Sequence, residues 1–390
     1  MIRAALILGL AAALLGCAGF GRSPHRAERK RLDASPQHQG RKFKNPEPMY
    51  INAWGVLGGT PRGIQDKPEA PLPVVPRTRD EFDTPPKSGL RATWLGHSSV
   101  LLELHGIKVL TDPHWGPRSS PFRRLGPKRW YAPPLPLDQV PAVDAVLISH
   151  DHYDHLDHTT IRRIAAWDTR FIVPLGVGGH LQRWGVPAER ITEVDWWEEV
   201  TLGPVRVACL PARHASGRRV STRDRTLWAG YALVGPQHRV YVSGDTGLFP
   251  AMERIGAEYG PFDLTMIEVG QYNEAWPDWH LGPEQAVLAH LMVRGEALLP
   301  VHWGLFRLAP HGWTAPIERV HAKAAELGVT VATPRPGESI EMRTLGDTQR
   351  WWPKLRWQDA SEQPIRATKA GDKRDRMDTE ALFERFAPPQ

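Results

Sequence analysis

The sequence predicts an α/β protein in which outer helices cover mixed β-sheets. From residue 90 onward, short apolar runs rich in Val, Leu and Ile are separated by tight turns, which is typical of strands. Some runs follow one another directly, as in a hairpin, whereas others alternate with segments of helical periodicity. Hairpins give antiparallel pairs and strand–helix units give parallel pairs, so both kinds of pairing are expected in the same sheets.

The individual elements follow from these runs in chain order. The apolar runs predict strands at 91–95, 99–104, 107–110, 144–149, 170–173, 205–210, 227–234, 238–243, 263–268, 297–301, 329–333 and 338–343. The amphipathic segments predict helices at 159–166, 177–184, 248–258, 283–294 and 315–327. Pro283 fits the first turn of its helix and Gly295 its end, while Gly328 closes the last helix.

Composition sets broad limits on the function. The chain has 390 residues, 41% of them hydrophobic, which is enough for one large domain or two small ones with a sizeable core. The net charge of +6 favours a solvated basic surface, with anionic lipid, nucleic acid or another acidic partner as the alternative. Sixteen Trp residues suit apolar pockets and membrane interfaces.

The N-terminus has the pattern of a lipoprotein signal peptide. A single Arg and a short apolar run precede Leu14-Leu15-Gly16-Cys17, which resembles a bacterial lipobox. The run is too short for a transmembrane helix. Cys17 would become the lipidated first residue; an ordinary signal peptide is the alternative. Because Ala18 replaces the usual Asp retention signal, we expect anchoring in the cell envelope, on the periplasmic side of the outer membrane in a Gram-negative cell. An exported lipoprotein has little access to nucleic acid, so none is expected as a partner.

The chain divides into five predicted parts. They are a signal peptide at 1–17, a polar and basic tether at 18–45, a Pro-rich arm at 46–89, a main domain at 90–345 and a charged tail at 346–390. The arm lacks clear periodicity and could wrap over the domain. The tail has a possible short helix near 379–386 and otherwise suggests disorder or loose docking. The second cysteine, Cys209, lies on a predicted strand and is expected to be a small buried hydrophobe.

The segment 150–158, His-Asp-His-Tyr-Asp-His-Leu-Asp-His, is the strongest functional signal. It follows a predicted buried strand and precedes a predicted helix. His150, His152, Asp154 and His155 therefore lie on one short turn. Imidazole nitrogen and carboxylate oxygen are ligands that suit zinc and neighbouring metals. The pattern predicts a metal site, and a solvated His-rich loop is the alternative.

Further ligands must come from other parts of the chain. The best candidates are His214, Asp245 and His302, each of which follows a predicted strand. Residues at the ends of several strands can converge at one edge of the sheets. Gly244 and Gly247 beside Asp245 would allow a close approach of the backbone to a metal. Taken alone, each of the three residues could equally be structural.

These residues and their surroundings resemble the metallo-β-lactamase fold superfamily. Within it, the sequence is similar to the branch of phospholipases D that hydrolyse N-acyl phosphatidylethanolamine. The His/Asp set is specific for the superfamily, and the flanking segments favour the branch. The matching segments are LRATWLGH (90–97), LTDP (110–113), GPKR (126–129), 144–157, SGDTG (243–247), GPFDL (260–264) and HWG (302–304).

The resemblance implies a four-layer αβ/βα sandwich with two zinc ions between the sheets. His150, His152 and His214 would hold one zinc, Asp154, His155 and His302 the other, and Asp245 would bridge both. Two close cations need a shared anionic ligand, and a bridging water of lowered pKa would supply hydroxide at neutral pH. Iron or manganese would fit the same ligands.

The resemblance also implies roles for residues around the ligands. Asp154, Asp245 and His280 are the expected catalytic residues, with Asp154 steering the water and His280 donating to a phosphate oxygen or a leaving group. Asp112 and His97 are expected next to the ligands, and Asp112 would orient a ligand imidazole through its other nitrogen. A simple strand-end turn is the alternative for Asp112, and a helix-start residue without a role is the alternative for His280.

Two smaller expectations concern neighbouring segments. Tyr272, Trp276 and Trp279 form an aromatic loop that could line an acyl-chain groove, with core packing as the alternative. Asp157 is expected to be the N-cap of the helix that follows it, and His158 is expected to be exposed.

Three functions from different classes fit these observations. The first is a dizinc phosphodiesterase that cleaves N-acyl phosphatidylethanolamine to phosphatidic acid and an N-acylethanolamine. The second is a dizinc hydrolase of a lactone or a small phosphodiester. The third is a non-catalytic, metal-stabilised lipoprotein, against which the complete ligand set argues. The sequence departs from the lipase relatives in its lipoprotein start, its charged tail and the segment 46–89. It predicts no oligomeric state.

Overall fold

The computed structural model describes residues 18–24, 28–55, 58–342, 345 and 349–387. The predicted signal peptide and the lipidation site Cys17 lie outside the described residues. Among the residues described, no helix combines the length and the apolar character needed to cross a membrane.

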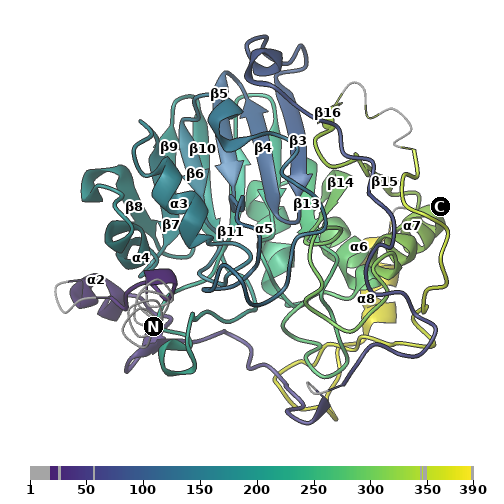
Figure 1. Ribbon diagram of the computed structural model, residues 1–390. Helices are drawn as coiled ribbons and strands as arrows, with labels where there is room; N and C mark the ends of the chain where they lie inside the picture. The colour runs from purple at the N-terminus through teal and green to yellow at the C-terminus, as the bar shows by residue number, and fades with distance from the viewer. Residues whose placement is uncertain (1–17, 25–27, 56–57, 343–344, 346–348, 388–390) are drawn as a thin grey trace, which may run out of the picture.

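Two seven-stranded sheets form the centre of the molecule (Figure 1). The first contains β3 (Leu90–Gly96), β4 (Ser99–Leu104), β5 (Ile107–Thr111), β6 (Ala145–Leu147), β7 (Arg170–Pro174), β8 (Ile191–Val194) and β16 (Ser339–Glu341). The second contains β9 (Glu199–Leu202), β10 (Val205–Leu210), β11 (Gly230–Val234), β12 (Arg239–Val242), β13 (Phe262–Glu268), β14 (Gly295–Val301) and β15 (Thr330–Val331). Their orders are β16-β3-β4-β5-β6-β7-β8 and β15-β14-β13-β12-β11-β10-β9.

Helices connect the parallel strands of both sheets. The helices are α2 (Arg29–Asp33), α3 (His158–Ile164), α4 (Gly178–Arg183), α5 (Ala251–Tyr259), α6 (Pro283–Met292), α7 (Ala315–Leu327) and α8 (Thr379–Phe386), and β1 (His38–Gln39) pairs with β2 (Lys42–Phe43). The strands from β3 to β5 and from β9 to β12 pair antiparallel, whereas those from β5 to β8 and from β12 to β15 pair parallel. A parallel pair needs a crossover; helices α3 to α7 supply five of the six, and the segment 112–144, which has only a short 3-10 helix, connects β5 to β6.

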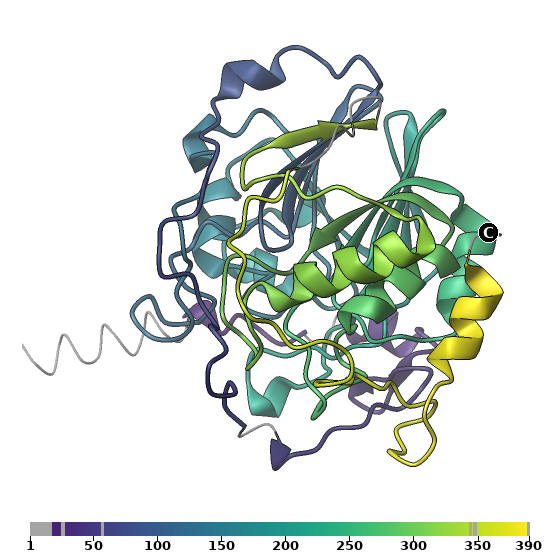
Figure 2. The ribbon, with the colours of Figure 1, turned by 90° about the vertical axis from the view of Figure 1, so that its right-hand side faces the viewer.

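The strand pattern places the core in two layers. Successive side chains of a strand point to opposite faces, so one strand feeds both layers. Leu101 of β4 packs with Ile161 and Leu181 beneath α3 and α4, whereas Leu102 belongs to the large cluster between the sheets that also contains Val207. With α5, α6 and α7 on the second sheet (Figure 2), the result is the predicted αβ/βα sandwich, and the fold prediction is confirmed.

Within the main domain, the predicted elements agree with the structure except at one corner. Helix α7 and the tail helix α8 have the predicted bounds, and the central strands differ by a few residues. The prediction missed β8 and β9. Both lie at sheet edges and are half-exposed, with sequences Ile-Thr-Glu-Val and Glu-Val-Thr-Leu. An edge strand of this kind carries no apolar run for a sequence pattern to detect.

The segment 18–45 packs on the domain, so its prediction as a tether is wrong. Leu32 and Phe43 are buried and belong to the same large apolar cluster as Leu102 and Val207. The backbone N–H of Arg22 donates to Nδ1 of His180 at 3.0 Å. Buried apolar side chains and polar contacts such as that of Arg31 with Glu198 hold a stretch whose overall composition is that of a linker.

The Pro-rich segment 46–89 runs along the surface of the domain (Figure 2). Backbone N–H groups of Val75 and Arg77 donate to the carbonyls of Pro336 and Pro134, both at 2.8 Å. The side chain of Phe82 is fully buried. Proline-rich backbone offers few donors for a sheet, which is why this contact is made by single hydrogen bonds rather than by strand pairing.

The tail is also docked rather than disordered. Gln363, Ala367 and Thr368 are buried, and Arg319 of α7 donates to the carbonyl of Gln363 at 3.1 Å. These contacts correct the expectation of disorder or loose docking. The buried residues are scattered among charged ones, so the sequence shows no apolar periodicity that would predict them.

Glu193 of β8 provides a test of the fold that is independent of the metal residues. Its Oε1 accepts hydrogen bonds from the backbone N–H groups of Gly176 and Gly178 at 2.9 and 2.8 Å, and burial raises the pKa of its carboxyl to about 7. An unfolded Glu has a pKa of about 4.3, so the folded state loses stability as the pH rises from that value through 7.

We therefore predict that Glu193→Gln raises the free energy of unfolding above pH 7 by about 1–3 kcal/mol and gives no such gain below pH 4. Denaturant unfolding at several pH values checks it. Glu189→Gln, at an exposed position, is the control and should show no pH-dependent gain. A constant difference between Glu193→Gln and the parent across the pH range would contradict the prediction.

Candidate metal centre

The candidate site lies where the carboxyl ends of parallel strands from both sheets meet. Strands β3, β5 and β6 run in one direction in the first sheet, as do β10, β12, β13 and β14 in the second. A polar residue lies at the end of each of these strands or shortly after it, at the edge where the two sheets meet. These residues are His97, Asp112, His150, His214, Asp245, Glu268 and His302.

One group of potential ligands consists of His150, His152, His214 and Asp245. Their ligand atoms all lie within 4.8 Å of one another. Nε2 of His150 is 2.9 Å from Nδ1 of His152, which in turn is 3.2 Å from Nε2 of His214. Three ring nitrogens thus converge on one point next to a carboxylate.

A second group surrounds Asp154. Its Oδ2 lies 2.9 Å from Nε2 of His97, 3.3 Å from Nε2 of His155 and 3.2 Å from Nε2 of His302. The four ligand atoms again lie within 4.8 Å of one another. His97, which we expected only beside the ligands, therefore has the same access to this position as the predicted ligands.

Asp245 lies between the two groups. Its Oδ2 is 3.1 Å from Nε2 of His155 and 3.2 Å from Nε2 of His302, and it is 3.7 Å from Nε2 of His150 and 3.8 Å from Nε2 of His214. One carboxylate oxygen thus faces imidazoles of both groups. This is the position that a bridging ligand between two metal ions requires.

The chemistry of these donors fits metal ions. Burial, together with neighbouring imidazoles, holds the pKa of His150 well below its usual value, so its ring is neutral near pH 7 and keeps a lone pair for a cation. Within the described part of the chain, the buried Oδ1 of Asp245 has no hydrogen-bond partner. Nitrogen and oxygen donors without thiolate suit zinc, iron and manganese alike. Two metal ions, one for each group, would satisfy these atoms.

Asp112 fixes one of the imidazoles from outside. Its Oδ2 lies 2.8 Å from Nδ1 of His155, and its carboxylate accepts hydrogen bonds from the backbone N–H and the hydroxyl of Ser149 at 2.7 and 2.6 Å. With Nδ1 engaged in this way, Nε2 of His155 is left for the site. The arrangement is the one that the resemblance implied for Asp112.

Glu268 is a buried carboxylate of the site that the sequence analysis missed. It accepts hydrogen bonds from the backbone N–H of Thr246 at 2.6 Å and from Nδ1 of His280 at 2.7 Å, and it lies 3.2 Å from Nδ1 of His302. Its oxygen also joins Asp245, His280 and His302 in a third group of converging ligand atoms. The only signal in the sequence is a single acidic residue at the end of an apolar strand.

His280 is held at the rim of the site. Its ring stacks on that of His302 with centroids 5.1 Å apart, and its side chain is 13% exposed. Because Nδ1 is bound to Glu268, a bound molecule would meet the other ring nitrogen, Nε2. The position of His280 is compatible with the expected catalytic role, and that role stays a prediction.

The backbone at the site is unusual in three places. His97, Asp112 and His302 all have positive φ values, of 54°, 36° and 65°. This region is unfavourable for residues with a side chain, and such residues gather at functional sites, where the surrounding structure holds them. Gly244 is required for a related reason, because a Cβ at its φ of +58° would lie 2.6 Å from the carbonyl oxygen of Ala229.

The residues around the metal-binding turn show one agreement and one correction. Asp157 caps α3, since its side chain accepts from the backbone N–H groups of Thr159 and Thr160, and the cap prediction is confirmed. His158 is half-buried rather than exposed, because its ring lies against Trp184 with centroids 5.1 Å apart.

The prediction that Tyr272 lines an aromatic groove is wrong. This residue is fully buried, its ring stacks on His311 at 4.5 Å, and the guanidinium of Arg319 lies over it. Core packing, the alternative, applies here. Trp276 and Trp279 are half-exposed, as a groove requires.

Trp279 has a place beside the candidate ligands. Its carbonyl accepts from Nδ1 of His214 at 2.8 Å, and its ring lies edge-on to that of His214. The guanidinium of Arg223 lies over the same indole at 5.1 Å.

A buried ion pair ties the arm and the tail to the site. Nη1 of Arg213 donates to Oδ1 of Asp278 at 3.2 Å and to the carbonyl of Thr368 at 2.7 Å, and Nη2 donates to the carbonyl of Pro48. Asp278 also accepts from the N–H and the hydroxyl of Thr368 at 2.7 and 2.6 Å and from the N–H of Tyr50 at 2.7 Å. Since Arg213 precedes His214, both terminal segments support the candidate ligands.

Comparison with known proteins agrees with this geometry. A family model described as a beta-lactamase superfamily domain matches residues 108–303, which include all of the predicted ligands. The chain belongs to the metallo-β-lactamase superfamily. It is therefore a metal-dependent hydrolase by family, as the resemblance implied.

Two curated relatives of the hydrolase cover most of its length. An uncharacterised protein of Mycobacterium tuberculosis is 45% identical over 334 residues, which are 82% of this chain and 88% of that protein. The N-acyl-phosphatidylethanolamine-hydrolyzing phospholipase D 1 of Caenorhabditis elegans is 36% identical over 300 residues, which are 70% of this chain and 83% of that protein.

Solved structures share the fold of the hydrolase. A metallo hydrolase from Ignicoccus hospitalis has a TM-score of 0.51 and 23% identity, and covers 64% of this chain and 97% of its own. An isothiocyanate hydrolase from Delia radicum gut bacteria has a TM-score of 0.52 and 16% identity, and covers 64% of this chain and 98% of its own.

The role of Asp112 leads to a prediction about metal retention. Asp112→Asn removes the negative charge beside Nδ1 of His155, so the hydrolase should bind metal about 10- to 100-fold more weakly while remaining folded. Metal content after titration with a chelator measures the change, and circular dichroism reports the fold. Asp144→Asn, at a carboxylate bound to the backbone N–H of Lys108, is the control. Equal metal retention in both variants would rule out the orienting role.

The ion pair at Asp278 leads to a prediction about stability. Thr368→Val removes a buried donor to Asp278 and should lower the free energy of unfolding of the hydrolase by about 1–3 kcal/mol. Denaturant unfolding measures the loss, and limited proteolysis should show the tail cleaved sooner. Thr201→Val, at an exposed position of β9, should leave both unchanged. A stability loss without earlier cleavage in the tail would argue against the view that the Arg213–Asp278 ion pair clamps the tail to the domain.

Proposed function

We propose that the protein is a dinuclear zinc phosphodiesterase of the phospholipase D type that acts on N-acyl phosphatidylethanolamine-like lipids. The observation that carries the proposal is the pair of ligand groups joined by Asp245. The 36% identity with the phospholipase D of Caenorhabditis elegans, over 83% of that protein, supports the choice of reaction.

The reaction adds water to a phosphodiester. The water oxygen forms a bond to phosphorus, and the bond between phosphorus and the oxygen of the N-acylethanolamine breaks. One proton of the water leaves during the attack, and the departing oxygen takes up a proton. The products are phosphatidic acid and an N-acylethanolamine. When bound, the two metal ions would lower the pKa of the attacking water and offset the charge that develops on the phosphate oxygens.

In this proposal, Asp154 orients the attacking water. Its side chain is 12% exposed, whereas Asp245 is almost fully enclosed. Three imidazoles fix Oδ2 of Asp154 through Nε2 of His97, His155 and His302. A carboxylate held in this way can accept a proton from a water at a defined position.

In this proposal, His280 protonates the departing oxygen. Glu268 accepts the proton on its Nδ1, so a second proton on the ring would sit on Nε2. The partial exposure of the ring lets that nitrogen reach a bound substrate.

One observation favours the second candidate function, hydrolysis of a lactone or a small phosphodiester. The burial of Tyr272 leaves two of the three predicted groove residues accessible, Trp276 and Trp279. A smaller aromatic rim suits a smaller substrate. Anchoring in the cell envelope through Cys17 stays a prediction for either function.

The test combines metal analysis with hydrolysis of N-acyl phosphatidylethanolamine by the purified full chain. We expect two metal ions per chain and release of phosphatidic acid, both reduced in Asp245→Asn. His280→Gln should keep the metal and lower kcat about 10²- to 10⁴-fold, since it removes only a proton donor. Asp144→Asn is the control and should retain the activity of the parent.

Other outcomes select among the candidates. Two metal ions without turnover of the lipid, but with cleavage of bis(p-nitrophenyl) phosphate or a lactone, would replace the proposal with the second function. A chain that takes up no metal after incubation with zinc would contradict the site itself.

A further inference from the structure

The loop of residues 117–128 is strongly basic and partly apolar at its tip. Its two arms meet at an isolated antiparallel bridge between Arg118 and Lys128. Beyond the bridge, Phe122 and Leu125 are 40% and 65% exposed, which is unusual for large apolar side chains. The loop contains no Asp or Glu. We call residues 117–128 the basic loop.

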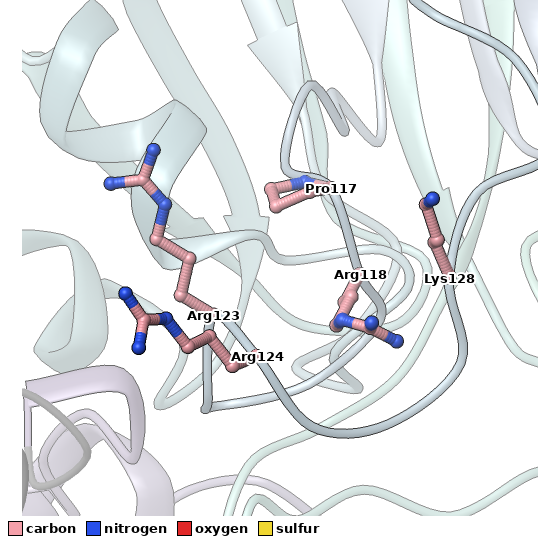
Figure 3. Close-up of a pocket in the computed structure, with 5 residues that line it drawn as sticks. All are labelled: Pro117, Arg118, Arg123, Arg124 and Lys128. Carbon is pink, nitrogen blue, oxygen red and sulfur yellow. The ribbon is translucent and has the colours of Figure 1, made fainter.

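Four cations of the basic loop surround an open hollow of about 540 Å³. Figure 3 shows Arg123 and Arg124 extending side by side from one arm, with Arg118 and Lys128 on the other side. Throughout the part of the chain that the structure describes, none of the four side chains is paired with a carboxylate. Their charge is therefore available to an anionic partner.

The basic loop touches the first described residues of the chain. The ring of Phe20 lies edge-on to Phe122 with centroids 5.8 Å apart. Arg219 places its guanidinium over Phe20 at 4.6 Å, and Val220, next in the chain, is 98% exposed. The carbonyl of Gly19 accepts from Nη2 of Arg218 at 2.7 Å. Cys17, the predicted lipidation site, is thus two residues from this contact.

Both segments border the turn that carries the metal-binding histidines. The backbone N–H of Gly217 donates to Oδ1 of Asp151 at 2.6 Å, and the hydroxyl of Tyr153 donates to the carbonyl of Arg218. On the other side, the N–H of Gly116, next to the basic loop, donates to Oδ2 of Asp157 at 3.0 Å. The exposed cations and apolar side chains therefore belong to loops that hold the turn of residues 150–158.

We propose that the basic loop, together with Phe20, Arg219 and Val220, docks on an anionic phospholipid surface. The cations would lie at the level of the headgroup phosphates, and Phe122, Leu125 and Val220 would enter the interface below them. The occupant is identified by charge complementarity and by Gly19 and Phe20 at this face, which follow the predicted lipidation site Cys17 closely in the sequence. Docking in this way brings the metal-binding turn next to the bilayer, whatever bond the protein hydrolyses.

The experiment is amide hydrogen exchange of the full chain on vesicles of phosphatidylcholine, with and without phosphatidylglycerol. Exchange at residues 117–128 and 217–223 should slow several-fold on the anionic vesicles, and high salt should reverse the effect. The hairpin at 234–239, at the opposite ends of β11 and β12, should exchange equally on both.

Charge reversal tests the cause. Arg123→Glu with Arg124→Glu should abolish the added protection on anionic vesicles while leaving hydrolysis of a soluble substrate unchanged. The matched control is Lys87→Glu with Arg294→Glu, two exposed cations before β3 and β14, at the opposite edge of the sheets. It should keep the protection.

Three results would overturn the inference. The first is equal exchange of both loops on neutral and anionic vesicles, which would mean that an anchor or adventitious contact alone holds the protein there. The second is unchanged protection after reversal of Arg123 and Arg124. The third is an equal loss in the control variant, which would assign the effect to net charge rather than to this face.

Discussion

The candidate metal centre depends on one electrostatic constraint, the burial of Asp245 among imidazoles from two ligand groups. Its Oδ2 lies within 3.8 Å of ring nitrogens from four histidines. A carboxylate removed from water is costly unless positive charge or hydrogen bonds surround it, and imidazoles crowded together repel one another once protonated. Two metal ions around a shared anion resolve both difficulties, and the surrounding fold is organised to keep these donors in place.

That organisation uses the polarity of the strands. All the strands that deliver candidate ligands run toward the same edge, so short segments after each strand are enough to bring distant residues together. Outside the ligands, Asp112 and Glu268 engage the far nitrogens of His155 and His280. The buried carboxylates thus have two roles. Asp154 and Asp245 face the metal position, whereas Asp112 and Glu268 fix the orientation of imidazole rings.

The sequence predicted the features that arise from local patterns. The His-rich turn, the long apolar strands and the capped helices α3 and α7 are each encoded within about fifteen residues, and the pairing of hairpins with strand–helix units indicated the sheet type. The resemblance to a known superfamily supplied the grouping of His214, Asp245 and His302, which no spacing could establish.

The features that were missed depend on contacts between distant residues. Glu268 resembles any acidic residue at the end of a strand, and only its bonds to Thr246 and His280 distinguish it. Tyr272 looks like a groove residue until Arg319 and His311 enclose it. The segment 18–45 and the tail have the composition of linkers, yet a few buried side chains such as Leu32 and Thr368 hold them.

The meeting of Pro48, Asp278 and Thr368 at Arg213 has a consequence for the order in which the molecule is assembled. These residues come from the beginning, the middle and the end of the chain, and all of them converge beside His214. Closing such long loops is slow and requires the whole polypeptide. The support of the metal-binding edge is therefore completed only after the last segment has been synthesised. A chain still emerging from the ribosome, or still crossing a membrane, would present the His-rich turn without the clamp that secures its neighbours.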